Sequence, residues 1–259
     1  MATNFHDTGI ARQWRGAVWQ CCVISACAAL LLLMLPRAAG SADPQGLGEE
    51  LIVHYSTIDG STGFVLDRSH DEPVLKFDSS LEMFILQDVP GPRGDTIYKL
   101  DNGFAVLRHT NLGGMILFDD LRPEGRPVMR DRVALRLTLP RRFPAQVKAR
   151  AAVISKEISD LLGSEVVFEA EWEAIPSRLG TATLADAVEL TGIALKRLAE
   201  DDLARDVLAA HLRRVTFQAG DVVDARLINH TLAITFVWTQ GMHGRFSSDA
   251  LVRLLEAAL

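Results

Sequence analysis

The chain is poor in cysteine, and its three cysteines, Cys21, Cys22 and Cys27, all lie within the first 42 of its 259 residues. The 217 residues that follow contain none, so no disulfide bond can hold them together. Small exported domains often depend on disulfides. This stretch is long enough to rely on a hydrophobic core instead. A disulfide-rich secreted scaffold is therefore excluded.

The familiar motifs of catalysis and metal binding are also missing. The sequence contains neither the Gly-x-Ser-x-Gly motif of a hydrolase nor a phosphate-binding loop. The histidines after residue 42 do not form a His-x-His or His-Glu-x-x-His pair, and they are His54, His70, His109, His211, His230 and His243. This spacing predicts no transition-metal site and no cofactor.

Long basic runs are absent too, the longest being Arg141-Arg142 and Arg213-Arg214. The formal net charge is −6, and it becomes −8 without residues 1–42, which carry three arginines and one aspartate. An acidic chain of this kind is not expected to bind nucleic acid or to adhere to an anionic membrane surface.

The first 42 residues have the pattern of an export signal. Arg12 and Arg15 precede an apolar run, residues 17–35, and this run is followed by small residues. Gly40 and Ala42 occupy the −3 and −1 positions, which a signal peptidase requires to be small. We therefore expect a signal peptide over residues 1–42 and an exported, periplasmic body.

Two alternatives to cleavage remain. Residues 17–35 are nearly long enough to span a bilayer, so an uncleaved anchor in the inner membrane would also place the body in the periplasm. Residues 24–27 resemble a lipoprotein signal ending at Cys27, but the apolar run continues to Leu35, where a polar tether would be expected. Apart from residues 17–35, no segment is expected to contact a membrane.

The first half of the body, residues 51–120, has the pattern of a β-domain. Short apolar runs alternate with turn residues, and Asn102-Gly103 predicts a tight hairpin because both residues tolerate a positive φ. We expect an antiparallel β-meander closing as a small sandwich or barrel. The predicted strands cover residues 63–67, 74–77, 83–87, 96–100, 104–108 and 115–118.

A linker and a further strand are predicted next. Residues 121–130 contain Pro123, Gly125 and Pro127 and are typical of a linker, whereas residues 132–139 alternate apolar and polar side chains, as a strand does.

The second half, residues 131–259, is predicted to be an α+β domain with helices on one face of an antiparallel sheet. The expected order after the linker is α-β-α-α-β-β-β-α. Helices are expected from Pro144 to Gly163, from a cap at Thr183, over residues 202–211 and from Ser247. Strands are expected over residues 165–173, 214–218, 222–228 and 231–238.

One stretch of the β-domain resembles a known family. The segments that carry the resemblance are Phe64-Val65-Leu66-Asp67-Arg68, Pro92-Arg93-Gly94-Asp95-Thr96-Ile97-Tyr98, Leu107-Arg108 and Leu112-Gly113-Gly114-Met115. Within residues 64–118 the chain is similar to a family of exported Gram-negative bacterial proteins known only as a domain of unknown function. The resemblance implies export, and it lends no activity and no catalytic residue.

The candidate ligand-binding residues are Arg68, Arg93, Asp95, Arg108 and His109, which all fall at predicted strand ends of one small sheet. If they converge, the arginines could bind an anionic ligand. The alternative is a set of internal ion pairs that stabilise the turns. We expect Asp95 to be a structural partner of an arginine or of loop amides rather than a catalytic acid.

A second candidate is the acidic strand that contains Glu169, Glu171 and Glu173. In an extended strand these carboxylates share one face, where they could act as acid and base or bind calcium. The alternative is the solvated face of an amphipathic strand.

Two functional hypotheses follow. The first is a non-enzymatic binding or assembly module of the bacterial cell envelope, with an envelope protein or an anionic ligand as its unidentified partner. The second is an envelope hydrolase that uses Glu169 and Glu171, or a cluster of Arg93, Asp95 and His109. The absence of a nucleophile, metal or cofactor motif favours the first.

The leader yields a direct prediction. Because small residues stand at Gly40 and Ala42, we expect the exported protein to begin at Asp43. N-terminal sequencing of the protein isolated from the cell envelope tests this. An intact leader would instead support the membrane anchor.

Overall fold

The computed structural model describes residues 50–119, 122–175 and 177–258, which belong to one compact unit. The predicted signal peptide, its three cysteines and the alternative anchor at residues 17–35 lie outside the described residues. Within the described part, no helix is long and apolar enough to cross a membrane. The fold is α+β, as predicted, with an antiparallel sheet first and helices packed on a second sheet afterwards.

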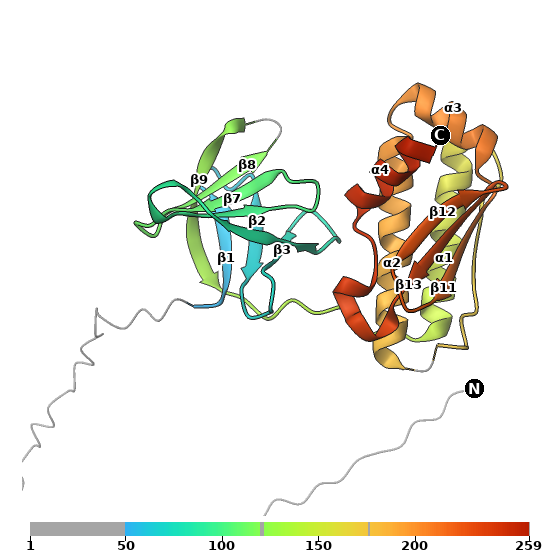
Figure 1. Cartoon of the computed structure of the whole chain (residues 1–259), viewed down its shortest axis with the longest axis horizontal. Coiled ribbons are helices and arrows are strands. Elements are labelled where there is room, and N and C mark those ends of the chain that lie inside the picture. The colour runs from blue at the N-terminus through green and yellow to red at the C-terminus, as the bar shows by residue number, and fades with distance from the viewer. Residues whose placement is uncertain (1–49, 120–121, 176, 259) are drawn as a thin grey trace, which may run out of the picture. The chain divides into compact units, whose positions relative to one another are not determined.

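The first half forms a nine-stranded sheet in which every pairing is antiparallel (Figure 1). Its strands pair in the order β4-β3-β2-β1-β9-β8-β7-β6-β5. They are β1 (Ile52–Thr57), β2 (Gly63–Asp67), β3 (Val74–Phe77), β4 (Phe84–Ile85), β5 (Gln87–Pro90), β6 (Thr96–Lys99), β7 (Ala105–His109), β8 (Met115–Asp119) and β9 (Arg122–Val133).

Leu86 explains why this sheet curls into a near-barrel. Strands β4 and β5 stand at opposite ends of the sheet order, yet only Leu86 separates them in the chain. The two edges must therefore meet at this residue. Leu86 is fully buried, and its amide donates to the carbonyl of Pro73 over 2.8 Å. The single strand predicted over residues 83–87 is wrong, since the chain leaves one edge at Leu86 and enters the other.

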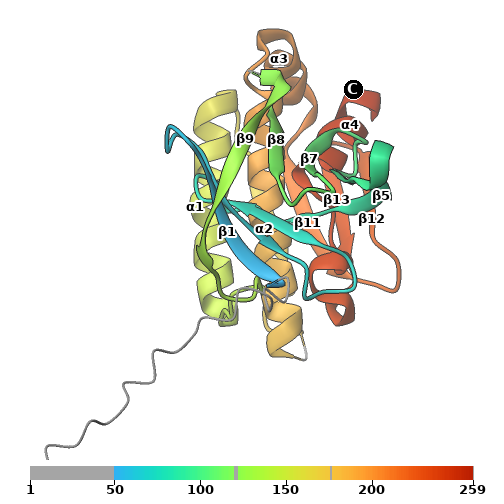
Figure 2. The ribbon, with the colours of Figure 1, turned by 90° about the vertical axis from the view of Figure 1, so that its left-hand side faces the viewer.

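Residues 122–133 form a twelve-residue strand, β9, so the predicted linker over residues 121–130 is wrong (Figure 2). This strand pairs with both β1 and β8 and thereby joins the two halves of the sheet. Gly125 has a φ of +85° beside a shift in the register between β8 and β9. A strand can contain such a bulge and continue, although in the sequence the glycine resembles a turn residue. The strand predicted over residues 132–139 is wrong beyond Val133, where β9 and its pairing end.

The interior of the near-barrel is apolar and partly aromatic. Phe64 is fully buried and stacks on Tyr55 with ring centroids 5.5 Å apart. The hairpin predicted at Asn102-Gly103 is present, with the amide of Leu100 donating to the carbonyl of Phe104. Only Gly103 of that pair takes a positive φ.

The second half has the predicted element order, α-β-α-α-β-β-β-α. A short 3₁₀ segment, Trp238–Gly244, precedes the last helix. The elements are α1 (Pro144–Leu162), β10 (Val167–Ala170), α2 (Arg178–Leu198), α3 (Asp202–His211), β11 (Arg214–Ala219), β12 (Asp224–Ile228), β13 (Thr231–Phe236) and α4 (Ser248–Ala258).

The second sheet is mixed, which corrects the prediction of an antiparallel sheet. Its order is β10-β11-β13-β12, with β11 parallel to both β10 and β13. Helices α2 and α3 form the crossover between β10 and β11, and a crossover of this length returns the chain in the same direction. Only β12 and β13 form an antiparallel hairpin, through positive φ values at Asn229 and His230.

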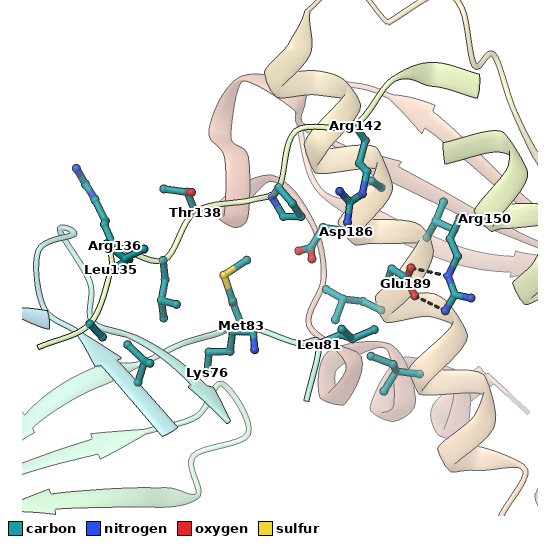
Figure 3. A pocket seen from close by; sticks show the side chains of 18 of the residues that line it. Lys76, Leu81, Met83, Leu135, Arg136, Thr138, Arg142, Arg150, Asp186 and Glu189 are labelled. Atoms are coloured by element: carbon teal, nitrogen blue, oxygen red, sulfur yellow. Dashed lines mark hydrogen bonds and ion pairs between the residues drawn. The ribbon is translucent and has the colours of Figure 1, made fainter. Parts of the chain in front are cut away.

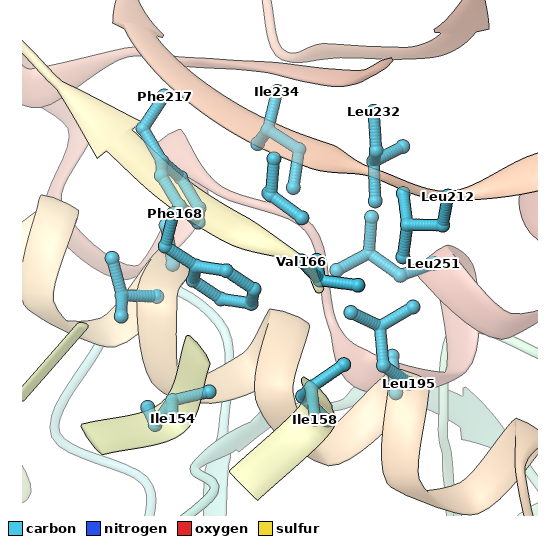
Figure 4. Packing of buried hydrophobic residues seen from close by; sticks show 14 of the residues in the cluster. Ile154, Ile158, Val166, Phe168, Leu195, Leu212, Phe217, Leu232, Ile234 and Leu251 are labelled. Carbon is cyan, nitrogen blue, oxygen red and sulfur yellow. The ribbon is translucent and has the colours of Figure 1, made fainter. Parts of the chain in front are cut away.

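Helices cover one face of this sheet, as predicted. Phe168, Phe217 and Ile234 point from the strands toward α1 and α2, where they meet Ile154 and Ile158 (Figure 4). The alternate positions on each strand remain partly or fully exposed. The opposite face of the sheet is therefore solvated.

Helix α2 begins six residues earlier than predicted. Ser177 is its N-cap, with the hydroxyl accepting from the amide of Gly180 at 3.0 Å. Thr183, the predicted cap, lies inside the helix. Gly180 lies in the first turn of the helix, and a Cβ at this buried position would lie 2.5 Å from the side chain of Ile175. Close packing, rather than a turn, explains this glycine.

A buried arginine connects the near-barrel to the helical layer. The side chain of Arg245 is 2% exposed. Its Nε donates to Oδ2 of Asp186 on α2 over 2.6 Å, and its Nη2 donates to the carbonyl of Met83 in the near-barrel over 2.9 Å. Beside it, Met83 packs with Val74 and Met242 in a small apolar cluster.

The first turn of α4 makes the second connection. Glu82 comes from the near-barrel and is 3% exposed. Its carboxylate accepts from the backbone amide of Ser248 at 2.9 Å and from the Ser248 hydroxyl at 2.5 Å. An acidic group at a helix N-terminus satisfies free amides and complements the helix dipole.

We expect Arg245→Ala to lower the free energy of unfolding by about 3–5 kcal/mol, because it leaves the buried Asp186 carboxylate and the Met83 carbonyl without their partner. Urea denaturation measures the effect. Arg253→Ala is the control, since that exposed arginine on α4 lies 3.5 Å from Asp101 and should contribute at most about 1 kcal/mol. Equal losses in the two variants would contradict the role of Arg245.

Candidate functional site

The structure separates the candidate cluster that sequence analysis placed in the β-domain. Asp95 is 5% exposed and accepts from Arg108 Nε at 2.6 Å and from the Asn111 amide at 2.9 Å. The Asn111 amide and then the Arg108 guanidinium lower the pKa of Asp95. The expected contact of Asp95 with an arginine and a loop amide is therefore present.

The other three members of the cluster are not bonded to this pair, although the charge of Arg93 is near enough to help lower the pKa of Asp95. Arg68 and His109 line a cavity of about 400 Å³ on the near-barrel, and neither Asp95 nor Arg108 lines it. Arg93 is exposed in a turn, with a φ of +62°, and its carbonyl accepts from the side chain of Asn111. The five residues do not converge on one ligand position.

The three glutamates do not share a strand face either, because β10 ends at Ala170. Glu169 is on the solvated face, where it lies 3.2 Å from Arg214 Nε. Glu171 follows the strand and lines the same cavity of about 670 Å³ as Glu169. The described residues contain no group of three or more His, Cys, Asp or Glu side chains that could hold a metal ion.

A larger cleft, of about 950 Å³, lies between the near-barrel and α2 (Figure 3). Three parts of the chain form it: the near-barrel around Met83, the connecting segment 134–142, and the facing sides of α1 and α2. Leu81 and Leu135, which are 66% and 89% exposed, mark its opening to solvent. The other apolar side chains that line it are Val65, Met83, Val133, Ala134, Leu137, Pro140, Val147, Ala185, Val188, Leu190 and Ile193.

Basic side chains outnumber acidic ones in the lining of this cleft. It is lined by five basic side chains and two acidic ones, namely Lys76, Arg132, Arg136, Arg142, Arg150, Asp186 and Glu189. Lys76, Arg136 and Arg142 form no ion pair with any other described residue.

Both acidic side chains are already paired. Glu189 accepts from Arg150 through both of its oxygens, at 2.7 and 3.0 Å. Asp186 accepts from Arg245, and burial raises the pKa of its carboxyl although the guanidinium opposes that rise. The field inside the cleft is therefore positive, although the chain as a whole is acidic.

Asp67 positions the connecting segment along the cleft. It is fully buried, and its carboxylate accepts from the amide of Leu137 at 2.8 Å and from the amide and hydroxyl of Ser69 at 2.8 and 2.6 Å. Burial alone would raise the pKa of Asp67, but the bonds from Ser69 and Leu137 outweigh it and lower the pKa. The segment is thus attached to the end of β2.

His54 is a second buried polar residue at the cleft, and sequence analysis assigned it no role. It is 5% exposed, with Nδ1 3.0 Å from Asp131 and Nε2 2.9 Å from Asp78. Gly63 makes room for this contact, because a Cβ there would lie 2.3 Å from Asp78 Oδ2. Both ring nitrogens are therefore occupied.

The cleft has no counterpart in the sequence pattern. Its lining comes from residues 54–83, 132–150 and 185–193, and only the folded chain brings these ranges together. The one local signal is the Arg141-Arg142 pair, which in the sequence is only a short basic run.

A comparison with known families identifies the chain. Residues 37–255 match the family described as domain of unknown function DUF4908. The chain belongs to this family. The match extends the resemblance over residues 64–118 to both halves of the DUF4908 fold described above. No curated protein and no solved structure matches the chain. Its function must therefore be argued from the cleft itself.

We expect Asp67→Asn to lower the free energy of unfolding by about 1–3 kcal/mol at neutral pH, because the amide cannot accept all the bonds that the carboxylate accepts. The pKa of Asp67 in the folded state lies below its unfolded value of about 3.9. The ionised carboxylate therefore stabilises the fold fully above that pH, and this stabilisation declines as the pH falls through the folded-state pKa.

Urea denaturation at about pH 7 and about pH 3 measures both effects, and the difference between wild type and Asp67→Asn should narrow at the lower pH. Asp71→Asn, at an exposed position four residues away, is the matched control. A difference that stays constant or widens at low pH would show that the ionised carboxylate is not what stabilises the segment.

Proposed function

We propose that this DUF4908 protein is a non-enzymatic binding module of the bacterial cell envelope and that the cleft beside α2 is its binding site. The observation that carries the proposal is a solvent-open cleft of about 950 Å³ with a mainly apolar lining and three basic side chains that lack an ion pair within the described structure. Small-molecule sites are typically concave and apolar with a few polar groups, and volumes of roughly 300–1,000 Å³ are usual.

The chemistry of the lining supports binding over catalysis. Glu189 and Asp186 are both engaged by arginines, and both nitrogens of His54 face carboxylates. Thr138 carries the only hydroxyl among the lining residues, and no cysteine is among them. The cleft thus holds no nucleophile paired with a base, the arrangement that covalent catalysis requires.

The location in the envelope rests on the leader. The basic residues, the apolar run and the small residues before Asp43 are the features of export to the periplasm. An uncleaved leader would place the same body on the periplasmic face of the inner membrane.

A fluorescence titration with Nile red, a neutral apolar dye, tests the proposal. The full chain would be expressed with its leader in a Gram-negative bacterium and purified from the envelope fraction. We expect saturable binding, and Leu135→Asp should weaken it by about tenfold, equivalent to about 1.4 kcal/mol, because a charge replaces apolar surface at the mouth of the cleft.

Leu112→Asp is the matched control, because Leu112 is 93% exposed and lies in a turn outside the cleft. It should bind the dye as the wild type does. If Leu135→Asp and Leu112→Asp behave alike, or if the protein is recovered from the cytoplasm, the proposal is wrong.

A further inference from the structure

We propose, building on the binding function above, that the ligand of the cleft is a long-chain fatty acid. Its acyl chain would lie along the apolar lining, and its carboxylate would bind Lys76 and Arg142. This assignment follows from the way that charge and apolar surface are divided within the cleft.

The apolar part has the chemistry of an acyl-chain site. Its side chains come from the near-barrel, the connecting segment and α2, for example Met83, Leu137 and Ile193. Figure 3 shows Met83 between the connecting segment and the near-barrel, in the middle of the space. Each methylene group that is buried against such surface favours binding, so a long chain gains affinity with each carbon.

Lys76 and Arg142 are the cations of the lining that are most available to an anionic group. Neither forms an ion pair with a described carboxylate, and Figure 3 shows Arg142 pointing from the connecting segment into the cleft. Lys76 and Arg142 contact only the carbonyl of a sequence neighbour, Phe77 at 3.4 Å and Arg141 at 3.5 Å. Arg136 is less available, because its Nη2 lies 3.4 Å from the carbonyl of the distant Ser69 and 3.3 Å from His70 Nδ1. An arginine binds a carboxylate through paired, charge-assisted hydrogen bonds.

The remaining lining disfavours a strongly polar ligand. Apart from His54, whose ring nitrogens both face carboxylates, Thr138 and Gln146 are the only polar lining side chains without a formal charge. A sugar or a peptide would bury hydroxyls or amides there without enough partners, which costs free energy. An acyl chain has no hydrogen-bonding groups to satisfy, and its single carboxylate matches the few free cations.

The test is a displacement titration that uses the protein preparation and Nile red described above. Oleate, kept below its critical micelle concentration, is compared with oleyl alcohol, which has the same chain and no charge. We expect oleate to displace the dye at a concentration about tenfold lower. Raising the salt concentration should narrow this difference, because salt screens the contact between the carboxylate and the cations.

The variant Lys76→Gln/Arg142→Gln removes the two cations. The affinity for oleate should fall about tenfold, whereas the affinities for oleyl alcohol and Nile red should stay unchanged. The variant Lys148→Gln/Arg178→Gln changes the net charge equally at exposed residues outside the cleft and should match the wild type. Thermal melting confirms that both variants fold.

The outcomes separate this inference from the proposed function. If Nile red binds in the cleft but oleate and oleyl alcohol displace it equally well, the fatty-acid assignment is overturned and the binding function stands. If both double variants lower the affinity for oleate equally, the assignment of the carboxylate to Lys76 and Arg142 is overturned. If no dye binds at the cleft, both proposals fail.

Discussion

The buried contact between Arg245, Asp186 and Met83 is the constraint on which the rest of the structure depends. Two layers that each have a core of their own need a specific contact to hold them in one arrangement. Arg245 supplies it, because its charge cannot be removed and its donors must be satisfied in the interior. The Glu82 carboxylate at the start of α4 adds a second attachment, again through hydrogen bonds with a defined direction.

The cleft follows from this arrangement. Arg245 holds Met83 against the layer that contains α2, and Asp67 holds Leu137 against the end of β2. Between these attachments lies apolar surface that neither core covers. The same contacts decide its charge, since Asp186 is neutralised by Arg245 from outside the lining and Glu189 by Arg150. Lys76 and Arg142 remain without such partners, which gives an acidic protein a locally positive site.

Local patterns predicted much of the fold, and they failed where distant packing decided the outcome. The strands at residues 63–67 and 74–77 and helix α3 were predicted with the bounds that the structure has. Pro123 and Pro127 suggested a linker, but the edges of β1 and β8 needed a partner and β9 supplies it. Similarly, Thr183 suggested a helix cap, but the helix begins at Arg178, and Gly180 in its first turn lets Ile175 approach. Neither role is visible without the neighbours that impose it.

The sequence by itself determined the division into a β-rich half and an α+β half, and it indicated an arginine and a loop amide as partners of Asp95. These features depend on the spacing of apolar residues along the chain, on turn residues, and on charged residues that are close to each other in the sequence. Only the tertiary structure decided the closure of the sheet at Leu86, the parallel pairing of β11 and the position of the cleft. Each of these joins segments far apart in the chain, and a linear pattern carries no information on the direction or distance at which such segments meet.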